Sequence, residues 1–210
     1  LLIIPASLIS NWIREIERFY PDLRVFTAHP DAQAKGRTVR AKSEKALDKL
    51  DLVITTYALS QRYKWLADYP WHCVILDEAQ AIKNPGTKQT RAVKGLSAVQ
   101  RVALTGTPIE NRLGDLWSLF DFLNPGLLGN KTEFVRFTKS LKDDPSGYAR
   151  LRKVVSPYIL RRLKTDKSVI SDLPEKVEMK TYASLSRKQV VLYQKMISEL
   201  EAALADSEGI

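Results

Sequence analysis

Apolar residues in the first half of the chain fall into short continuous runs separated by longer stretches with helical periodicity. Short runs are typical of strands buried on both faces, whereas apolar spacings of three and four are typical of amphipathic helices. The runs predict strands at 1–4, 23–28, 52–56, 73–76 and 101–104, and the stretches between them predict helices at 8–19, 38–50, 58–67 and 87–96. This alternation predicts an α/β fold, a parallel sheet covered by helices.

The alternation ends beyond residue 113. The pattern there predicts a helix at 116–123, mostly helical structure over 130–155 with a loop at 143–147, one more strand at 177–182, and an amphipathic helix at 187–205. We therefore expect three regions: an α/β domain over 1–125, a basic helical segment over 126–175, and a last strand and helix over 176–210.

Composition narrows the class of protein. Of the 210 residues, 44% are apolar and 27% charged, the profile of a soluble globular protein. No apolar run approaches the ~20 residues of a membrane-spanning helix, and no signal peptide opens the chain, so we expect no membrane partner. Cys73 is the single cysteine and the histidines are His29 and His72, too few for a disulfide framework or a metal cluster. These counts predict a cytosolic or nuclear protein without a structural metal.

The charge is unevenly spread. Lys and Arg total 33 against 24 acidic residues, a net charge of +9, and residues 131–190 hold 15 basic against 7 acidic side chains. A basic surplus in one segment favours phosphate-rich polymers as partners. On charge alone, a merely solubilising surface is an equal alternative.

The sharpest chemical signal is the run Val74–Gln80, in which Asp77 and Glu78 directly follow an apolar strand. Burying two adjacent carboxylates would be costly, so they must emerge at the strand's end, facing solvent or a cation. This is the Walker B pattern of nucleotide hydrolases, in which the first acid holds hydrated Mg²⁺ and the second polarises the attacking water. The alternative is a strand end followed by a helix whose first turn favours acids.

A second polar segment, Leu104–Asn111, follows the next strand and contains Thr105, Gly106 and Thr107. Hydroxyls and a glycine at a strand end form a tight loop with rotatable donors, suited to sensing a neighbouring site. The alternative is an ordinary turn.

Together these segments resemble the Swi/Snf-type DNA translocases of helicase superfamily two. The resemblance covers nearly all 210 residues in the family's order. It rests on motif Ia at Pro5–Trp12, motif II at Asp77–Gln80 with its extension Ala81–Asn84, motif III at Leu104–Asn111, the segment that leaves the first lobe at Arg161–Asp166 and Asp172–Pro174, and the start of a helical insertion at Ser186–Gln189 and Tyr193.

The resemblance implies a RecA-like lobe of a P-loop NTPase with a helical insertion, and ATP and Mg²⁺ as cofactors. Asp77 would bind Mg²⁺, Glu78 would be the catalytic base, and Gln80 with Thr105, Gly106 and Thr107 would couple nucleotide state to DNA. The implied DNA contacts are Ser7, Asn11, Thr55, Thr56, Lys83, Arg161, Arg162 and Lys164. The basic residues among 161–164 have a plainer alternative as a solvated face.

The phosphate-binding loop G-x-x-x-x-G-K-[ST] is absent, because no glycine in the chain is followed by lysine. The first residue is not methionine, so we expect a fragment that lacks the lobe's first strand and P-loop and that neither binds ATP tightly nor hydrolyses it alone. Losing a strand would leave Leu1–Ile4 or its neighbour as an unpaired sheet edge, so we also expect self-association through that edge.

The expected function is therefore that of a double-stranded DNA translocase that remodels DNA-bound protein complexes. The alternatives are another superfamily-two motor, such as a restriction-enzyme subunit or an RNA helicase, and a non-catalytic DNA- or protein-binding scaffold. We expect the protein in the cytoplasm, associated with the nucleoid, if it is bacterial, and in the nucleus if it is eukaryotic.

Overall fold

The computed structural model describes residues 1–30, 44–106, 113–141, 146–162, 179, 181–182 and 184–207. The chain divides into two compact units, Leu1–Val154 and Val155–Ile210. The predicted boundaries after residues 125 and 175 stay a prediction.

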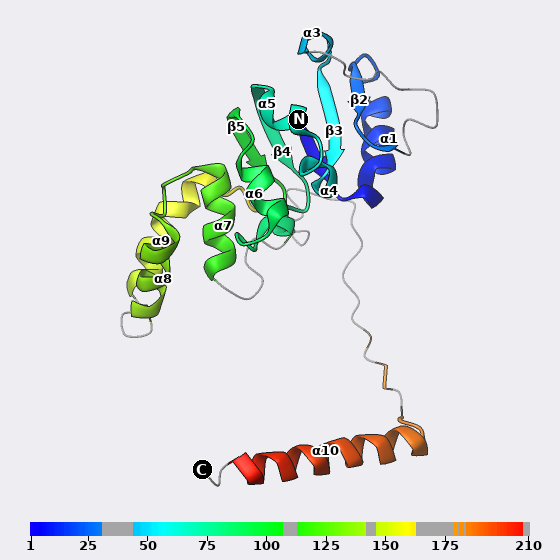
Figure 1. Cartoon of the computed structure of the whole chain (residues 1–210), viewed down its shortest axis with the longest axis vertical. Helices are drawn as coiled ribbons and strands as arrows, with labels where there is room; N and C mark the ends of the chain where they lie inside the picture. Colours follow the sequence, from blue (N-terminus) through cyan, green and yellow to red (C-terminus); the bar gives the residue numbers. More distant parts are fainter. Residues whose placement is uncertain are drawn as a thin grey trace. The chain divides into compact units, whose positions relative to one another are not determined.

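The first unit is built on a five-stranded sheet in the order β2–β3–β1–β4–β5 (Figure 1). Each neighbouring pair of strands is parallel. The strands are β1 (Leu2–Ile4), β2 (Val25–Thr27), β3 (Leu52–Thr56), β4 (Trp71–Leu76) and β5 (Ala98–Ala103). The predicted α/β fold with a parallel sheet is confirmed.

Both faces of the sheet are covered, because successive side chains of a strand point to opposite faces. Leu2 and Ile4 pack with Ile9, the first residue of helix α1 (Ile9–Phe19). Leu1 and Ile3 belong to a larger core that includes residues of helices α6 (Lys88–Lys94) and α7 (Leu113–Leu123). Burial on both sides explains why the strands read as continuous apolar runs.

The other helices largely follow the predicted pattern. They are η1 (Ala6–Leu8), α3 (Glu44–Leu47), α4 (Tyr57–Ser60), α5 (Lys64–Asp68), η2 (Ala79–Ile82), α8 (Lys131–Ser140), α9 (Ser146–Val155), η3 (Ser156–Tyr158) and α10 (Arg187–Ser207). The predicted helix at 58–67 is two short helices. The predicted loop at 143–147 is too long, because α9 already begins at Ser146.

The prediction of an unpaired edge at Leu1–Ile4 or its neighbour is wrong. Leu2 pairs with Ile54 of β3 on one side and with Ile75 of β4 on the other, so β1 is central. The neighbours β3 and β4 are also paired on both sides, and the edges are β2 and β5. The crossover connections fix strand order, so the first strand along the chain need not lie at an edge. The predicted self-association thereby loses its structural basis.

The strand predicted at 177–182 is not found where the structure can test it. Met179, Thr181 and Tyr182 lie outside any strand, and residues 177, 178 and 180 are not among those described. Among the described helices, none combines the length and apolar character that crossing a membrane requires.

Candidate active site

The carboxyl ends of the parallel strands meet at one edge of the sheet, where ligands of open α/β sheets bind. The turn after β4 is fixed there by backbone hydrogen bonds to both sides. The amide of Asp77 donates to the carbonyl of Ile3 at 2.9 Å, and the amide of Ala79 donates to the carbonyl of Leu104 at 2.9 Å. The acidic turn therefore lies between the ends of β1 and β5.

Three further hydrogen bonds hold the half-buried Asp77. Its Oδ2 accepts from Nε1 of Trp12 at 2.7 Å, and its Oδ1 accepts from the amide of Glu78 at 2.9 Å. The Tyr57 hydroxyl donates to the Asp77 carbonyl at 2.7 Å. Burial, together with the nearby charges of Asp77 and Glu78, raises the pKa of Tyr57, so this hydroxyl keeps its proton and stays a donor.

Glu78 has a left-handed backbone, with φ 51° and ψ 52°. In the part of the chain that the structure describes, it is the one non-glycine residue with positive φ. This conformation costs roughly 1–2 kcal/mol for a residue with a Cβ. Strain of this kind persists where surrounding bonds fix it, and it concentrates at functional sites. Here the bond from the Glu78 amide to Asp77 and the backbone bonds on either side fix it.

A chain of hydrogen bonds joins the acidic turn to the end of β5. Nε2 of Gln80 donates to Oε2 of Glu78 at 2.6 Å, and Oγ1 of Thr105 donates to Oε1 of Gln80 at 2.9 Å. The structure thus brings the predicted base Glu78 together with Gln80 and Thr105, two of the predicted coupling residues, whose role stays a prediction. Gly106 follows and is exposed, and Thr107 lies outside the described residues.

The donor set at this turn fits hydrated Mg²⁺. Asp77 and Glu78 supply carboxylate oxygens, the ligand type that Mg²⁺ prefers, and each oxygen with one hydrogen bond keeps acceptor capacity. No described Lys or Arg forms an ion pair with either carboxylate, so no cation in that part of the chain neutralises them. Within the described residues there is no group of three or more His, Cys, Asp and Glu that could hold a fully protein-ligated metal. Mg²⁺ usually keeps several waters and needs only one or two carboxylates.

In the first unit, the residues predicted to contact DNA form an exposed group and a buried group. Ser7 in η1, Asn11 in α1 and Lys83 at the end of η2 are exposed. Thr55 and Thr56 are 0% and 4% exposed, and their place on a DNA-contacting face stays a prediction. The Thr55 hydroxyl donates to the carbonyl of Ala28, and Thr56 Oγ1 accepts from the Leu59 amide as the N-cap of α4.

Arg161 and Arg162 belong to the second unit, where both are exposed. Lys164 lies outside the described residues. Their predicted role in phosphate contact or lobe bracing stays a prediction.

Two residues of the site were not predicted. Trp12 enters the sequence analysis only as the last residue of motif Ia, and its indole holds a carboxylate oxygen of Asp77. Tyr57 directly follows β3 and binds the Asp77 carbonyl. One signal could have identified both: each lies shortly after a strand that ends at the same edge as the Asp77 strand.

A parallel sheet in this order, with paired carboxylates after β4 and a hydroxyl after β5, defines a RecA-like ATPase lobe. The SNF2-related domain matches residues 1–209. The chain therefore belongs to the SNF2 family.

Two curated relatives are similar to the chain over most of its length. The chain is 40% identical over 209 residues to the uncharacterized ATP-dependent helicase MG018 of Mycoplasma genitalium, covering 100% of this chain and 20% of the relative. It is 34% identical over 200 residues to the human SWI/SNF-related matrix-associated actin-dependent regulator of chromatin subfamily A member 1, covering 94% of this chain and 19% of that protein. The chain thus spans about a fifth of these relatives.

A solved structure agrees with the fold. The Sulfolobus solfataricus SWI2/SNF2 ATPase core in complex with dsDNA is 40% identical and superposes with a TM-score of 0.71. The match covers 98% of this chain and 42% of that chain.

Proposed function

We propose that the whole protein, meaning the full-length polypeptide that contains these 210 residues, is a translocase on double-stranded DNA. Its ATP hydrolysis is stimulated by duplex DNA and drives the remodelling of DNA-bound protein complexes. The observation that carries this proposal is the fixed acidic turn, in which Asp77 and Glu78 are oriented at the sheet edge by Trp12, Tyr57 and Gln80.

The two carboxylates have separate roles. Asp77 holds Mg²⁺, with its side chain oriented by the Trp12 indole and the Glu78 amide. Glu78 accepts a proton from the water that attacks the γ-phosphate. When bound, Mg²⁺ would neutralise negative charge on the phosphates. A non-catalytic scaffold would gain nothing from a strained, hydrogen-bonded pair of acids at a strand end.

The hydrogen bonds Glu78–Gln80–Thr105 support a coupling role. Because Gln80 bonds both the base and the end of β5, a shift of the loop that begins at Thr105 changes the hydrogen bonding of Glu78. Ser7, Asn11 and Lys83 are exposed polar groups that can contact a DNA backbone. Contacts to phosphate and sugar fix position without reading sequence, as translocation requires.

The 210 residues alone are proposed to be inactive, because they contain no Gly-Lys pair to cradle phosphates. Isothermal titration of ATP into the 210-residue chain tests this point. We expect no binding in the micromolar range, and micromolar affinity would contradict it.

Glu78→Gln in the whole protein tests the catalytic assignment. The amide keeps the size and acceptor oxygen of the side chain but removes the base, so we expect turnover to be abolished while ATP binding is spared. Glu15→Gln on the exposed face of α1 is the matched control and should behave as wild type. Wild-type turnover in Glu78→Gln would contradict Glu78 as the catalytic base, whereas no turnover in the wild-type protein would favour the scaffold.

A further inference from the structure

Helix α8 carries a basic face that the proposed site does not use. Lys131, Arg136 and Lys139 are exposed and form no ion pair with described residues. At 3.6 residues per turn Lys131 and Lys139 share one side of the helix with Val135, which is 42% exposed, and Arg136 flanks that side. Phe134, on another side of the helix, and Leu141, which directly follows the helix, are buried.

The carboxylate of the single acid of α8 is engaged at the start of the helix. Glu133 Oε2 accepts from the Asn130 amide at 2.9 Å in a capping box. Glu133 also lines a hollow shared with α9 residues Arg150 and Leu151, whereas Lys131 and Val135 line a different groove. Glu133 is a surface neighbour of Arg136 at i+3 but forms no ion pair with it, and it lies away from Lys131 and Lys139.

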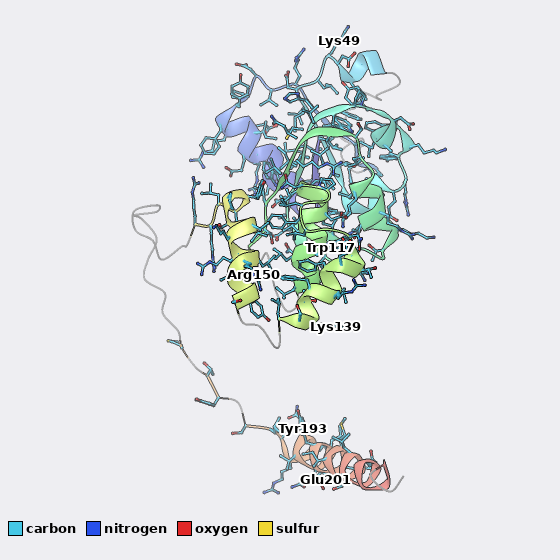
Figure 2. The ribbon with its side chains drawn as sticks, turned by 90° about the vertical axis from the view of Figure 1, so that its left-hand side faces the viewer. Lys49, Trp117, Lys139, Arg150, Tyr193 and Glu201 are labelled. Carbon is cyan, nitrogen blue, oxygen red and sulfur yellow. The ribbon has the colours of Figure 1, made fainter. Side chains whose placement is uncertain are left out.

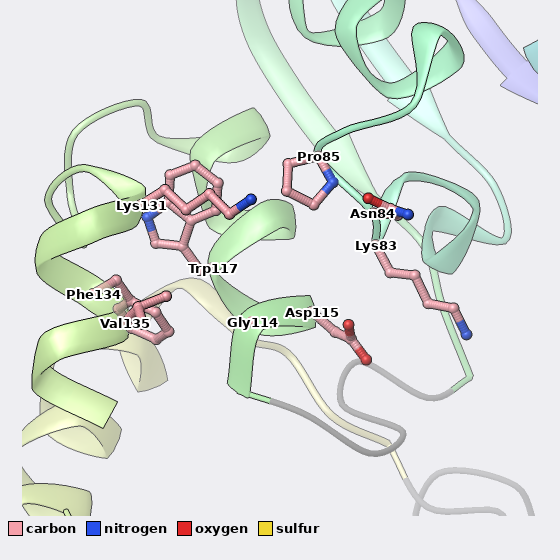
Figure 3. Close-up of a pocket in the computed structure, with 9 residues that line it drawn as sticks. All are labelled: Lys83, Asn84, Pro85, Gly114, Asp115, Trp117, Lys131, Phe134 and Val135. Carbon is pink, nitrogen blue, oxygen red and sulfur yellow. The ribbon is translucent and has the colours of Figure 1, made fainter. Parts of the chain in front are cut away.

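That groove connects α8 to the segment that follows the acidic turn. Its volume is about 490 Å³. Figure 3 shows Lys83, Asn84 and Pro85 on one wall and Lys131 and Val135 of α8 on the other. Two lysines therefore face the groove from separate elements. Asp115 of α7 also lines it, and this acid disfavours phosphate deep in the groove but leaves the lysine-bearing walls basic.

We propose that the basic face of α8, with Lys83 across the groove, is a second contact surface for the phosphate backbone of duplex DNA. This proposal rests on the proposed function, since it extends the DNA path away from η1 and α1. Lys131 and Lys139 lie about 12 Å apart along the helix axis, at 1.5 Å per residue. Each strand carries one phosphate per 3.4 Å of duplex axis, so a helix lying parallel to that axis would pass about three to four phosphates of one strand.

The test compares duplex-DNA affinity of the whole protein at several salt concentrations. The variant is Lys131→Gln/Arg136→Gln/Lys139→Gln, which keeps helix propensity and removes three charges. The matched control is Lys49→Gln/Arg62→Gln/Lys64→Gln, which removes three exposed charges elsewhere on the same unit. Figure 2 shows Lys49 and Lys139 at opposite ends of that unit.

Each lost phosphate contact should reduce the magnitude of the salt slope by about 0.9. We expect the salt slope of the α8 variant to be smaller in magnitude by about 2–3 and its affinity for duplex DNA to be at least tenfold weaker. Both quantities should be unchanged in the control. Equal slopes for the two variants, with wild type binding DNA, would overturn this inference alone and point to a protein partner for α8. No DNA binding by wild type would overturn both this inference and the proposed function.

Discussion

The indole Nε1 of Trp12 donates a 2.7 Å hydrogen bond to Oδ2 of Asp77, joining residues 65 positions apart in the chain. The bond links the helix after β1 to the turn after the neighbouring strand β4. Asp77 therefore reaches its orientation through a donor on another segment, and Trp12 is a positioning residue.

Trp12→Phe should keep the packing of this α1 side chain against the cluster that contains Leu2 and Ile4, and it removes the donor. Partners that orient a metal-binding carboxylate typically contribute 10–100-fold to activity or metal affinity. We expect kcat of ATP hydrolysis by the whole protein to fall by about tenfold or more, with a higher Mg²⁺ requirement. Trp65→Phe, which alters an aromatic cluster with Tyr63 and Trp71, is the control. Equal kcat and Mg²⁺ dependence in the two variants would contradict the positioning role.

Thr105→Val should break the hydrogen bond to Gln80 while keeping a β-branched side chain of similar size. The expected result is a lower ratio of DNA-stimulated to basal ATP hydrolysis. Basal hydrolysis should persist because Glu78 and Gln80 are unchanged, whereas the hydrogen bond that links Gln80 to the end of β5 is lost. Steady-state ATPase rates with and without duplex DNA measure this ratio. Thr138→Val, whose hydroxyl bonds only to the carbonyl of Val135 in its own helix, should leave it unchanged. An unchanged ratio in Thr105→Val would remove the evidence for coupling through this hydroxyl.

Ser118→Ala tests how η2 is fixed. The fully buried Ser118 donates from Oγ to the carbonyl of Ile82 at 2.6 Å, which ties α7 to the segment after the acidic turn. Leaving that carbonyl without its partner should lower the free energy of unfolding by about 1–3 kcal/mol. Urea unfolding of the chain measures this, with Ser140→Ala on the exposed face of α8 as the control, expected within about 0.5 kcal/mol of wild type. Equal losses in both variants would show that the bond to Ile82 is not stabilising.

The ion pair Arg24–Asp51 gives a pH dependence. Hydrogen bonds from Arg24 lower the pKa of Asp51 from 3.8 to about 2. Because the folded pKa is depressed, the pair stabilises the fold above about pH 4, and that contribution is lost as the pH falls toward 2. An NMR titration of the Asp51 carboxyl should return a pKa near 2 in wild type and in the control Arg14→Gln, and a value raised toward 3.8 in Arg24→Gln, where only the backbone amide of residue 24 still donates to the carboxylate. A pKa near 3.8 in wild type would contradict the pairing.

The sequence identifies the parts of this fold that depend on local patterns. Short apolar runs locate the five strands, and the acids at 77 and 78 locate the site, because buried strands cannot hold charge. Strand order is different: nothing in Leu1–Ile4 says that it pairs on both sides, since crossover packing decides the order.

Side-chain roles are predictable only where chemistry restricts them. Thr55 and Thr56 could be read as exposed DNA contacts, yet the first bonds to Ala28 and the second caps a helix, since a threonine serves either purpose. The role of Trp12 could not be predicted, because its partner Asp77 is distant in sequence. The hydrogen bond between Gln80 and Thr105 forms because both residues follow strands that end at one sheet edge, and their coupling role stays a prediction.

ATP hydrolysis by the whole protein, measured at saturating Mg²⁺ with and without duplex DNA, tests the central claim most directly. We predict slow hydrolysis without DNA, a severalfold or larger increase on adding duplex DNA of any sequence, and no hydrolysis in either condition for Glu78→Gln. A wild-type protein that binds ATP and DNA yet shows no hydrolysis, or the same rate with and without DNA, would contradict it.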